Sequence, residues 1–302
     1  MTRLDRRRFV AAASAVAASV ASSKASPSLL MKAIPSTGET VPAIGMGSWL
    51  TFDVGDDPSL RRQRAEVLGA FFEGGGRIID SSPMYGSSQA VIGAALKSLG
   101  KADACFAADK VWTPGGEEGP SQIDRTRRRW GVERFDLLQV HNLVDWRRHL
   151  ETLFAMKAEG RLRYVGVTTY AGLRHAEVEA IMTSEPIDFV QLTYNIADRE
   201  AEERILPLAV ERRIAVIANR PFREGALFAR VEGARPPDFA ADIGASTWAQ
   251  FMLKFAISHP AVTCAIPATR RVDHMRENVG ALTGPSPDAA MRRKMAAAFD
   301  AL

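Results

Sequence analysis

Cysteine and histidine are scarce in this chain, and their scarcity limits the chemistry open to it. Among 302 residues there are two cysteines, Cys105 and Cys264, and five histidines. Both cysteines lie inside apolar runs, which excludes a framework of disulfides and a cysteine-based zinc site. The histidines are scattered along the chain, so they offer no cluster of metal ligands. We therefore expect a protein without a metal site.

Charge of one sign is not in large excess either. Lys and Arg number 39 and Asp and Glu 35, a formal net charge of +4 at pH 7. The arginine runs at 6–8 and 127–129 do not alternate with aromatic side chains, as a nucleic-acid surface requires. The composition, 46% hydrophobic and 25% charged, excludes a disordered chain. It indicates a globular protein that binds no nucleic acid.

Residues 1–26 have the composition of a signal peptide. A basic stretch at 3–8 precedes the apolar run Phe9–Ala21, and small residues follow with a cleavage site near Ala25. The apolar run is too short and too rich in alanine for a spanning helix, so no membrane span is expected after cleavage. An uncleaved membrane anchor or a merely basic N-terminus is the alternative.

The segment Asp5-Arg6-Arg7-Arg8-Phe9-Val10 resembles the twin-arginine export signal. This resemblance implies that the twin-arginine machinery of a bacterium carries the folded protein to the periplasm. Residues 27–302 then form the mature protein. We expect them to be one domain, because α/β barrels use about 250 residues as a single unit.

Strand-like apolar runs alternate with helical periodicity through the rest of the chain. Continuous apolar strands, each followed by a helix, are typical of a parallel sheet covered by helices, and eight such units predict a (β/α)8 barrel of the TIM type. The runs Met31–Ile34 and Thr40–Pro42 predict a hairpin at the barrel floor, and Asp288–Leu302 predicts a C-terminal helix. The expected strands are Ala43–Ser48, Ile78–Ser81, Cys105–Val111, Leu137–His141, Tyr164–Thr168, Phe189–Thr193, Ala215–Ala218 and Cys264–Pro267. The expected helices between them are Ser59–Glu73, Ser88–Leu99, Ser121–Trp130, Trp146–Glu159, Leu173–Thr183, Ala201–Arg212, Ser246–Ser258 and Val272–Leu282.

Four ionisable residues follow consecutive strands of this pattern. Asp80 and Tyr85 come after the second strand, Lys110 ends the third and His141 ends the fourth. Active sites of such barrels lie at the carboxyl ends of the strands, so these side chains are expected to converge. Each residue alone is equally typical of a cap, a rim position or a salt bridge. The four together favour catalysis.

Their chemistry suits proton transfer to a carbonyl oxygen. The pKa of free tyrosine is about 10, and a nearby cation favours the phenolate that remains after proton donation. Lys110 offers that cation, and Asp80 can hold the lysine in place. His141, as a neutral donor, can position the carbonyl oxygen. We expect Tyr85 to act as a general acid.

Three segments resemble the signature blocks of the aldo-keto reductases. They are IDSSPMYGSS at 79–88, DKVW at 109–112 and DLLQVHN at 136–142, and the resemblance extends from about residue 34 to residue 282. It implies an NAD(P)H-dependent oxidoreductase that reduces an aldehyde, ketone or sugar to an alcohol. It also implies, for the four ionisable residues, the roles just described.

The resemblance further implies where a nicotinamide cofactor binds. Thr168 and Thr169 stand where relatives often place Ser and Asn for the carboxamide, and Gln191 serves the same group. Arg270 or Arg271 can meet a 2′-phosphate, which favours NADP(H) over NAD(H). The full set of expected cofactor positions is Ser48, Trp49, Thr168, Thr169, Gln191, Asn219, Arg220, Thr269, Arg270, Arg271, Glu277 and Asn278.

Several positions depart from the family pattern. Asn219 stands where relatives commonly have the Tyr that stacks on the nicotinamide ring, which weakens the ring contact unless Trp49, Phe222 or another aromatic residue substitutes. Gln89 replaces an acidic residue, and Ala268 and His274 stand where many relatives have Lys or Gly and Arg. These changes bear on cofactor affinity, whereas the four ionisable residues are intact.

Phe52, Trp112 and Asn142 lie in segments expected to border an apolar substrate pocket, with packing at the barrel rim as the alternative. Two other functions stay open at this stage. One is a cofactor-binding regulatory or redox-sensing barrel with little turnover. The other is a metal-dependent hydrolase or isomerase, although only His141 among the histidines ends a strand.

Overall fold

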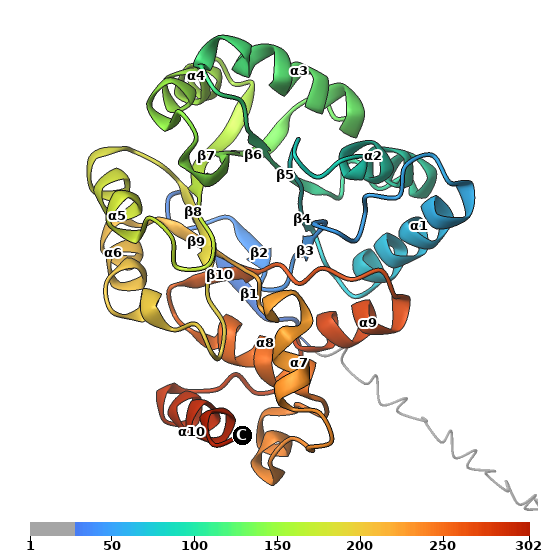
Figure 1. Ribbon diagram of the computed structural model, residues 1–302, viewed down its shortest axis with the longest axis vertical. Coiled ribbons are helices and arrows are strands. Elements are labelled where there is room, and N and C mark those ends of the chain that lie inside the picture. The colour runs from blue at the N-terminus through green and yellow to red at the C-terminus, as the bar shows by residue number, and fades with distance from the viewer. Residues whose placement is uncertain (1–27) are drawn as a thin grey trace, which may run out of the picture.

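Continuous apolar runs form the eight strands of one parallel sheet in the computed structural model, which describes residues 28–302 (Figure 1). The strands follow one another in chain order, and every neighbouring pair is parallel. The predicted (β/α)8 barrel is therefore confirmed. The strands are β3 (Met46–Gly47), β4 (Ile78–Asp80), β5 (Phe106–Val111), β6 (Phe135–Val140), β7 (Leu162–Thr168), β8 (Phe189–Thr193), β9 (Ala215–Asn219) and β10 (Val262–Ala265).

A short seam brings the first and last strands of the barrel together. Ile44 forms a parallel bridge with Ala265, and the N–H of Gly45 donates to the carbonyl of Ala265 at 2.9 Å. A Cβ on Gly45 would lie 2.9 Å from the carbonyl oxygen of Ile78 and 3.0 Å from Sγ of Cys264. Only glycine allows the strands to approach this closely, so this residue permits the barrel to close.

The predicted hairpin consists of β1 (Met31–Ala33) and β2 (Thr40–Pro42), which pair antiparallel. Its turn bonds to the barrel floor, where the hydroxyl of Tyr164 lies 2.8 Å from Thr37 Oγ1 and donates to Glu39 Oε2 at 2.7 Å. Above the hairpin, the rings of Phe106, Tyr164 and Phe189 contact one another inside the barrel. The floor is therefore filled, so a site on the barrel axis of the described residues must lie at the opposite end.

Helices surround the sheet and bury its outer face (Figure 1). The first of them begins at Pro58, where the carboxylate of Asp57 accepts the N–H groups of Ser59 and Leu60 at 2.8 and 2.9 Å. The helices are α1 (Pro58–Glu73), α2 (Ser88–Leu99), α3 (Gly119–Trp130), α4 (Trp146–Ala158), α5 (His175–Ser184), α6 (Ile205–Arg212), α7 (Ala226–Arg230), α8 (Trp248–Ser258), α9 (Val272–Gly280) and α10 (Ala289–Asp300). The last is the predicted C-terminal helix.

The structure differs from the sequence pattern in several places. The first strand, expected over Ala43–Ser48, is shortened to Met46–Gly47, and the fourth ends at Val140, so His141 begins a 3-10 turn. The last strand ends at Ala265, so the segment expected to continue to Pro267 is already loop. The helix expected over 201–212 is divided into a 3-10 turn at Glu200–Glu202 and α6. No element is expected between 219 and 245, where the structure has α7 and the 3-10 helix Asp238–Ile243. Short helices of this kind lack the periodicity by which longer ones are found.

The signal peptide expected over residues 1–26 lies outside the described residues. Within residues 28–302, no helix is both long enough and apolar enough to span a bilayer.

Candidate active site

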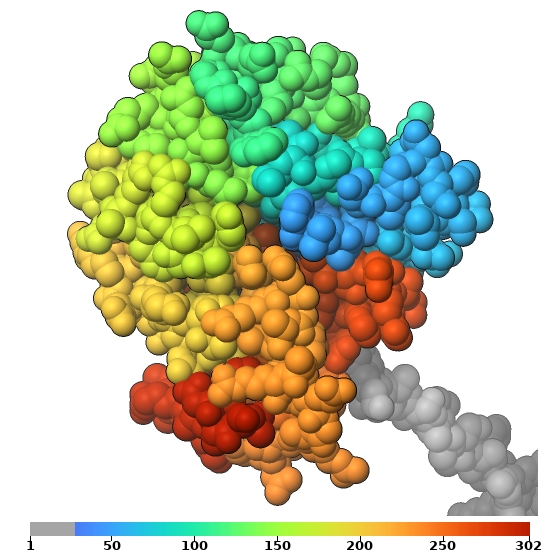
Figure 2. Space-filling view, viewed as in Figure 1, coloured from blue at the N-terminus to red at the C-terminus, as the bar shows by residue number. Residues whose placement is uncertain are grey.

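A cavity of about 430 Å³ opens at the carboxyl ends of the strands, where the space-filling view shows the molecule hollowed (Figure 2). Most of the residues singled out from the first seven strands line it. They are Ser48, Trp49, Asp80, Tyr85, His141, Asn142, Thr168, Thr169, Gln191, Asn219 and Arg220. Parallel strands all end at this mouth, so the topology alone brings together residues that are up to 172 positions apart, from Ser48 to Arg220.

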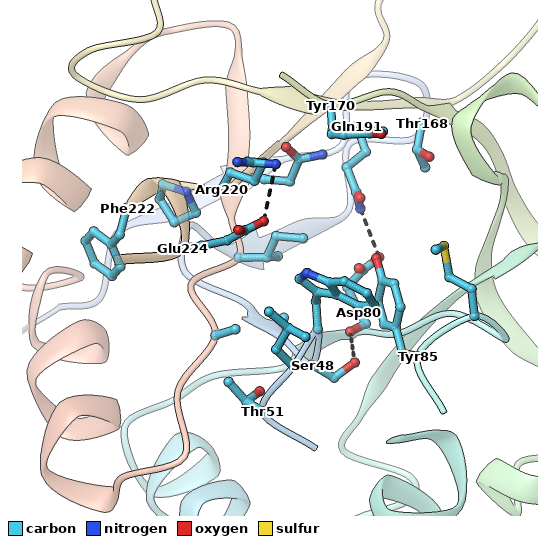
Figure 3. A pocket seen from close by; sticks show the side chains of 18 of the residues that line it. Ser48, Thr51, Asp80, Tyr85, Thr168, Tyr170, Gln191, Arg220, Phe222 and Glu224 are labelled. Carbon is cyan, nitrogen blue, oxygen red and sulfur yellow. Dashed lines mark hydrogen bonds and ion pairs between the residues drawn. The ribbon is translucent and has the colours of Figure 1, made fainter. Parts of the chain in front are cut away.

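Lys110 lies beneath the cavity and is fully buried. Its Nζ donates to Oδ2 of Asp80 at 2.6 Å and to the carbonyl oxygen of Ser81 at 2.6 Å. The other oxygen of Asp80 accepts hydrogen bonds from the side-chain amides of Gln191 at 2.9 Å and Gln139 at 3.5 Å, and the first of these is drawn in Figure 3. The ion pair is therefore desolvated but well supplied with hydrogen bonds.

The phenol of Tyr85 stands above this pair. Nζ of Lys110 lies 5.3 Å from the ring centroid, and the ring also meets Trp49 at 4.9 Å and His141 at 5.7 Å between centroids. Burial raises the pKa of Tyr85 to about 12, while the charge of Lys110 acts to lower it. The lysine therefore has the effect expected from the sequence, but burial exceeds it. At neutral pH the phenol carries its proton.

His141 lies edge-on against the ring of Tyr85, and both residues line the cavity. Burial, followed by the charge of Lys110, lowers the pKa of His141 well below its ordinary value, so the imidazole is neutral at neutral pH. Nδ1 lies 2.7 Å from Oγ of Ser82, which is fully buried. A neutral imidazole carries one N–H, and such a group can donate to a carbonyl oxygen in the cavity.

Burial also opposes the charge on Lys110, but the acidic side chains around it prevail. Asp80, Tyr85 and Asp109 together raise the pKa of the lysine above its ordinary value. The lysine consequently stays protonated, and a permanent positive charge lies beneath the phenol.

Sequence reasoning missed Ser82 and Gln139 as members of the site. Both stand within the motif blocks, Ser82 two residues after Asp80 and Gln139 two residues before His141. In a strand, side chains two positions apart point to the same face, which is the signal that identifies Gln139. Ser82 lies beyond the end of β4, where no such period applies.

The three residues expected to bind the cofactor's carboxamide, Thr168, Thr169 and Gln191, differ in which of their hydrogen-bonding atoms remain free. Thr168 Oγ1 accepts the N–H of Asn142 at 3.0 Å and keeps its own hydrogen for a ligand, whereas the hydroxyl of Thr169 donates to the carbonyl of Leu173. Gln191 donates to Asp80 and leaves Oε1 free among the described contacts. A free donor and a free acceptor beside one another fit a carboxamide.

Asn219 is occupied within the protein. Its amide nitrogen donates to the carbonyl of Thr169 at 2.9 Å, and its oxygen accepts the hydroxyl of Thr193 at 2.7 Å. The residue joins the ends of β7, β8 and β9 and offers no aromatic face. Tyr170, Trp49 and Phe228 line the same cavity and are each about two-fifths exposed, so all three present aromatic rings that a ligand can reach.

The segment after β9 borders the cavity in a strained conformation. Arg220, Arg223 and Glu224 all have positive φ angles, between 47° and 57°, which side chains other than glycine rarely adopt. Arg220 and Glu224 form an ion pair at 3.2 Å across this segment (Figure 3). The guanidinium is partly exposed at the rim and can exchange this partner for an anionic ligand.

The residues expected around the adenosine end lie outside the cavity. Arg271 is exposed and paired with Asp273, whereas no ion pair holds Arg270 within residues 28–302. Asn278 is buried and Glu277 is half-buried. Thr269 Oγ1 accepts the N–H of Arg271 at 3.2 Å.

Two of the expected substrate-pocket residues do not reach the cavity. Phe52 is fully buried in the hydrophobic core, because the loop after β3 turns its side chain inward. Trp112 is 40% exposed, and its backbone is held by the side chain of Gln122 away from the lining residues. Of the three expected residues, Asn142 is the one that lines the cavity.

Within residues 28–302, no group of three or more His, Cys, Asp or Glu side chains is placed to hold a metal ion. One further polar atom in the cavity lacks a partner, Oγ1 of Thr51. A buried hydroxyl without a partner is costly, so a ligand that bonds to it would be favoured.

The comparisons with known proteins agree with this geometry. Residues 43–296 match the model of the aldo/keto reductase family. Methylglyoxal reductase YeaE of Escherichia coli is 28% identical over 252 residues, which cover 80% of this chain and 86% of that protein. The NADH-specific methylglyoxal reductase of the same organism is 24% identical, over 65% of this chain and 69% of its own length. A Klebsiella pneumoniae aldo/keto reductase solved with NADP and acetate has a TM-score of 0.73 at 24% identity and covers 90% of this chain and 96% of its own. The chain belongs to the aldo/keto reductase family of oxidoreductases.

Proposed function

We propose that this protein reduces the carbonyl group of an aldehyde, ketone or sugar to an alcohol, with Tyr85 as the proton donor. One observation carries the proposal. A protonated phenol and a neutral imidazole face the same cavity, with a buried ammonium ion beneath the phenol. A carbonyl oxygen in the cavity, beside the hydroxyl of Tyr85 and the imidazole of His141, would accept a hydrogen bond from each.

The chain's own residues account for the proton transfer. As negative charge develops on the carbonyl oxygen, Tyr85 gives up its proton and becomes a phenolate. Lys110 stabilises that phenolate, and Asp80 holds the lysine at 2.6 Å. His141 fixes the direction of approach. A reduced nicotinamide, when bound beside Thr168 and Gln191, supplies the hydride for the carbonyl carbon.

NADPH is the proposed cofactor, in preference to NADH. The family resemblance gives Arg270 or Arg271 as the partner of a 2′-phosphate, and among the described residues Arg270 is the one of the two without an ion pair. A guanidinium binds a phosphate dianion through paired hydrogen bonds. NADH has no 2′-phosphate, so it cannot accept these bonds. One relative is named as NADH-specific, so the preference of this protein for NADPH has to be measured.

Small carbonyl compounds are the first substrates to consider. One relative is named a methylglyoxal reductase, and the cavity here combines apolar walls with a few polar groups. We further propose that residues 1–26 are a twin-arginine signal peptide and that the enzyme acts in the periplasm. Because free NADPH is not expected outside the cytoplasm, the protein would leave the cell interior with its cofactor already bound.

The decisive experiment uses the protein without its leader, from residue 27 onward. NADPH and NADH are titrated by quenching of tryptophan fluorescence, and cofactor oxidation is followed with a panel of aldehydes, ketones and sugars. Consumption of NADPH with any carbonyl supports the proposal. Binding without turnover would instead support a regulatory barrel, a reading that the occupied Asn219 makes worth testing. Failure to bind either cofactor would contradict both.

A further inference from the structure

The hydrogen bond between Ser82 and His141 determines which ring nitrogen of the histidine faces the cavity. Ser82 Oγ lies 2.7 Å from Nδ1 of His141, and it also accepts the N–H of Met84 at 3.3 Å. Ser82 is fully buried, so water does not contribute further partners. These two contacts are the ones that the hydroxyl makes within residues 28–302.

Counting donors and acceptors distinguishes the two possible arrangements. The neutral imidazole has one N–H, on either Nδ1 or Nε2. If Nδ1 carried the hydrogen, it would donate to Ser82 Oγ, and the hydroxyl hydrogen of the serine would be buried without an acceptor. If Nε2 carries the hydrogen, the serine hydroxyl donates to Nδ1, and the N–H of Nε2 is left for the cavity that His141 lines. The second arrangement leaves no buried donor of this pair without an acceptor, and unsatisfied buried donors are strongly disfavoured.

We infer that Ser82 is a positioning residue that holds His141 as the Nε2–H tautomer, with this N–H directed at the substrate's carbonyl oxygen. Orienting a ring through its second nitrogen is a general use of histidine, because the bond made by one nitrogen fixes the state of the other. The catalytic consequence rests on the proposed function, since it assumes a carbonyl in the cavity. The tautomer itself does not.

The role of Ser82 predicts a specific failure when its hydroxyl is removed. In Ser82→Ala, Nδ1 has no fixed partner, so both tautomers become populated and the ring can rotate. Molecules with Nδ1–H present a bare acceptor to the carbonyl oxygen and repel it. The kcat/KM for the carbonyl should fall roughly tenfold, whereas the affinity for the cofactor should stay the same.

The test is ¹⁵N NMR of the histidine ring nitrogens in the full chain without cofactor. The His141 signals are assigned by their loss in His141→Gln. We expect a protonated Nε2 and an unprotonated Nδ1 in the unchanged protein, averaged values in Ser82→Ala, and the original pattern in Ser82→Thr, which keeps the hydroxyl. Ser88→Ala is the matched control, because that serine is fully buried and its hydroxyl has no partner.

Two outcomes overturn the inference. One is an Nδ1–H tautomer in the unchanged protein, and the other is an unaltered Nε2–H signal in Ser82→Ala. Both readings are made without catalysis. If the tautomers behave as expected and no carbonyl is reduced, the proposed function fails while the inference about Ser82 stands.

Discussion

Nζ of Lys110 lies 2.6 Å from Oδ2 of Asp80, and the two side chains are 0% and 3% exposed. An ion pair so fully removed from water gains little stability over apolar residues of the same shape, because desolvation offsets the attraction. The presence of this ion pair is better explained by the phenol of Tyr85, which lies above it. The pair keeps a fixed positive charge under Tyr85, where the proposed function requires a phenolate to form.

Replacing Tyr85 with Phe should lower turnover by orders of magnitude, because the ring remains but the proton donor is lost. Cofactor affinity should be almost unchanged, since the hydroxyl contributes to proton transfer and not to the cofactor positions. Steady-state kinetics and a fluorescence titration of the same preparation measure both. Wild-type rates in this variant would eliminate Tyr85 as the acid.

Replacing Lys110 with Met should destabilise the protein by about 3–5 kcal/mol, because it leaves the carboxylate of Asp80 buried without its counter-charge. Urea unfolding at pH 7 gives this free energy. The control is Arg161→Met, which removes an ion pair with Glu159 whose members are both 57% exposed, and should change stability by less than about 1 kcal/mol. If the two substitutions lowered the free energy of unfolding equally, the argument that burial makes the Lys110–Asp80 pair costly to break would be contradicted.

Asp109 should make stability depend on pH. This fully buried carboxyl accepts the N–H of Lys110 and Nε1–H of Trp130, both at 2.6 Å, and burial raises its pKa to about 7. A folded-state pKa above the unfolded value means that the folded protein binds the extra proton. The contribution of Asp109 to stability is therefore fully present below about pH 4 and is lost as the pH rises to about 7.

The comparison that isolates this effect is Asp109→Asn against the unchanged protein. Relative to the unchanged protein, the variant should gain a few kcal/mol between pH 5 and pH 8, because each pKa unit corresponds to about 1.4 kcal/mol. Chemical unfolding at several pH values supplies the data. A stability difference that is constant with pH would show that Asp109 is ionised throughout.

Arg270 should distinguish the two cofactors more strongly than Arg271. Arg270→Met is expected to weaken NADPH binding about tenfold or more and to leave NADH binding unchanged, since only NADPH has the 2′-phosphate. Arg271→Met is the matched control, with a smaller effect because that guanidinium already pairs with Asp273. Parallel fluorescence titrations with NADPH and NADH measure the affinity of each variant for both cofactors. An equal loss of NADPH and NADH affinity would place Arg270 elsewhere than at the 2′-phosphate.

The departure at Gln89 has a physical explanation in the fold. Its amide nitrogen donates to both oxygens of Asp109 at 3.1 Å, and its oxygen accepts from Arg129 at 3.2 Å. An acidic residue at position 89 would have placed a second carboxylate against the buried one at 109. The amide is thus matched to Asp109, a relation that no local pattern in the sequence reveals.

The sequence by itself determined the barrel and the four ionisable residues of its mouth. Eight apolar runs separated by helical patterns allow few other topologies, and parallel strands must end on one side, so Asp80, Lys110 and His141 had to meet. This inference needs only the chain order and the direction of the strands. It does not need the coordinates of any side chain.

Only the tertiary structure decided how those groups behave and which neighbours reach them. Burial, which depends on the whole packed molecule, sets the pKa of Tyr85 near 12 and keeps His141 neutral. The inward turn of the loop after β3 removes Phe52 from the cavity, and the loop after β4 places Ser82 on the imidazole. Loop conformation and desolvation arise from contacts between residues distant in sequence, so local patterns carry no record of them.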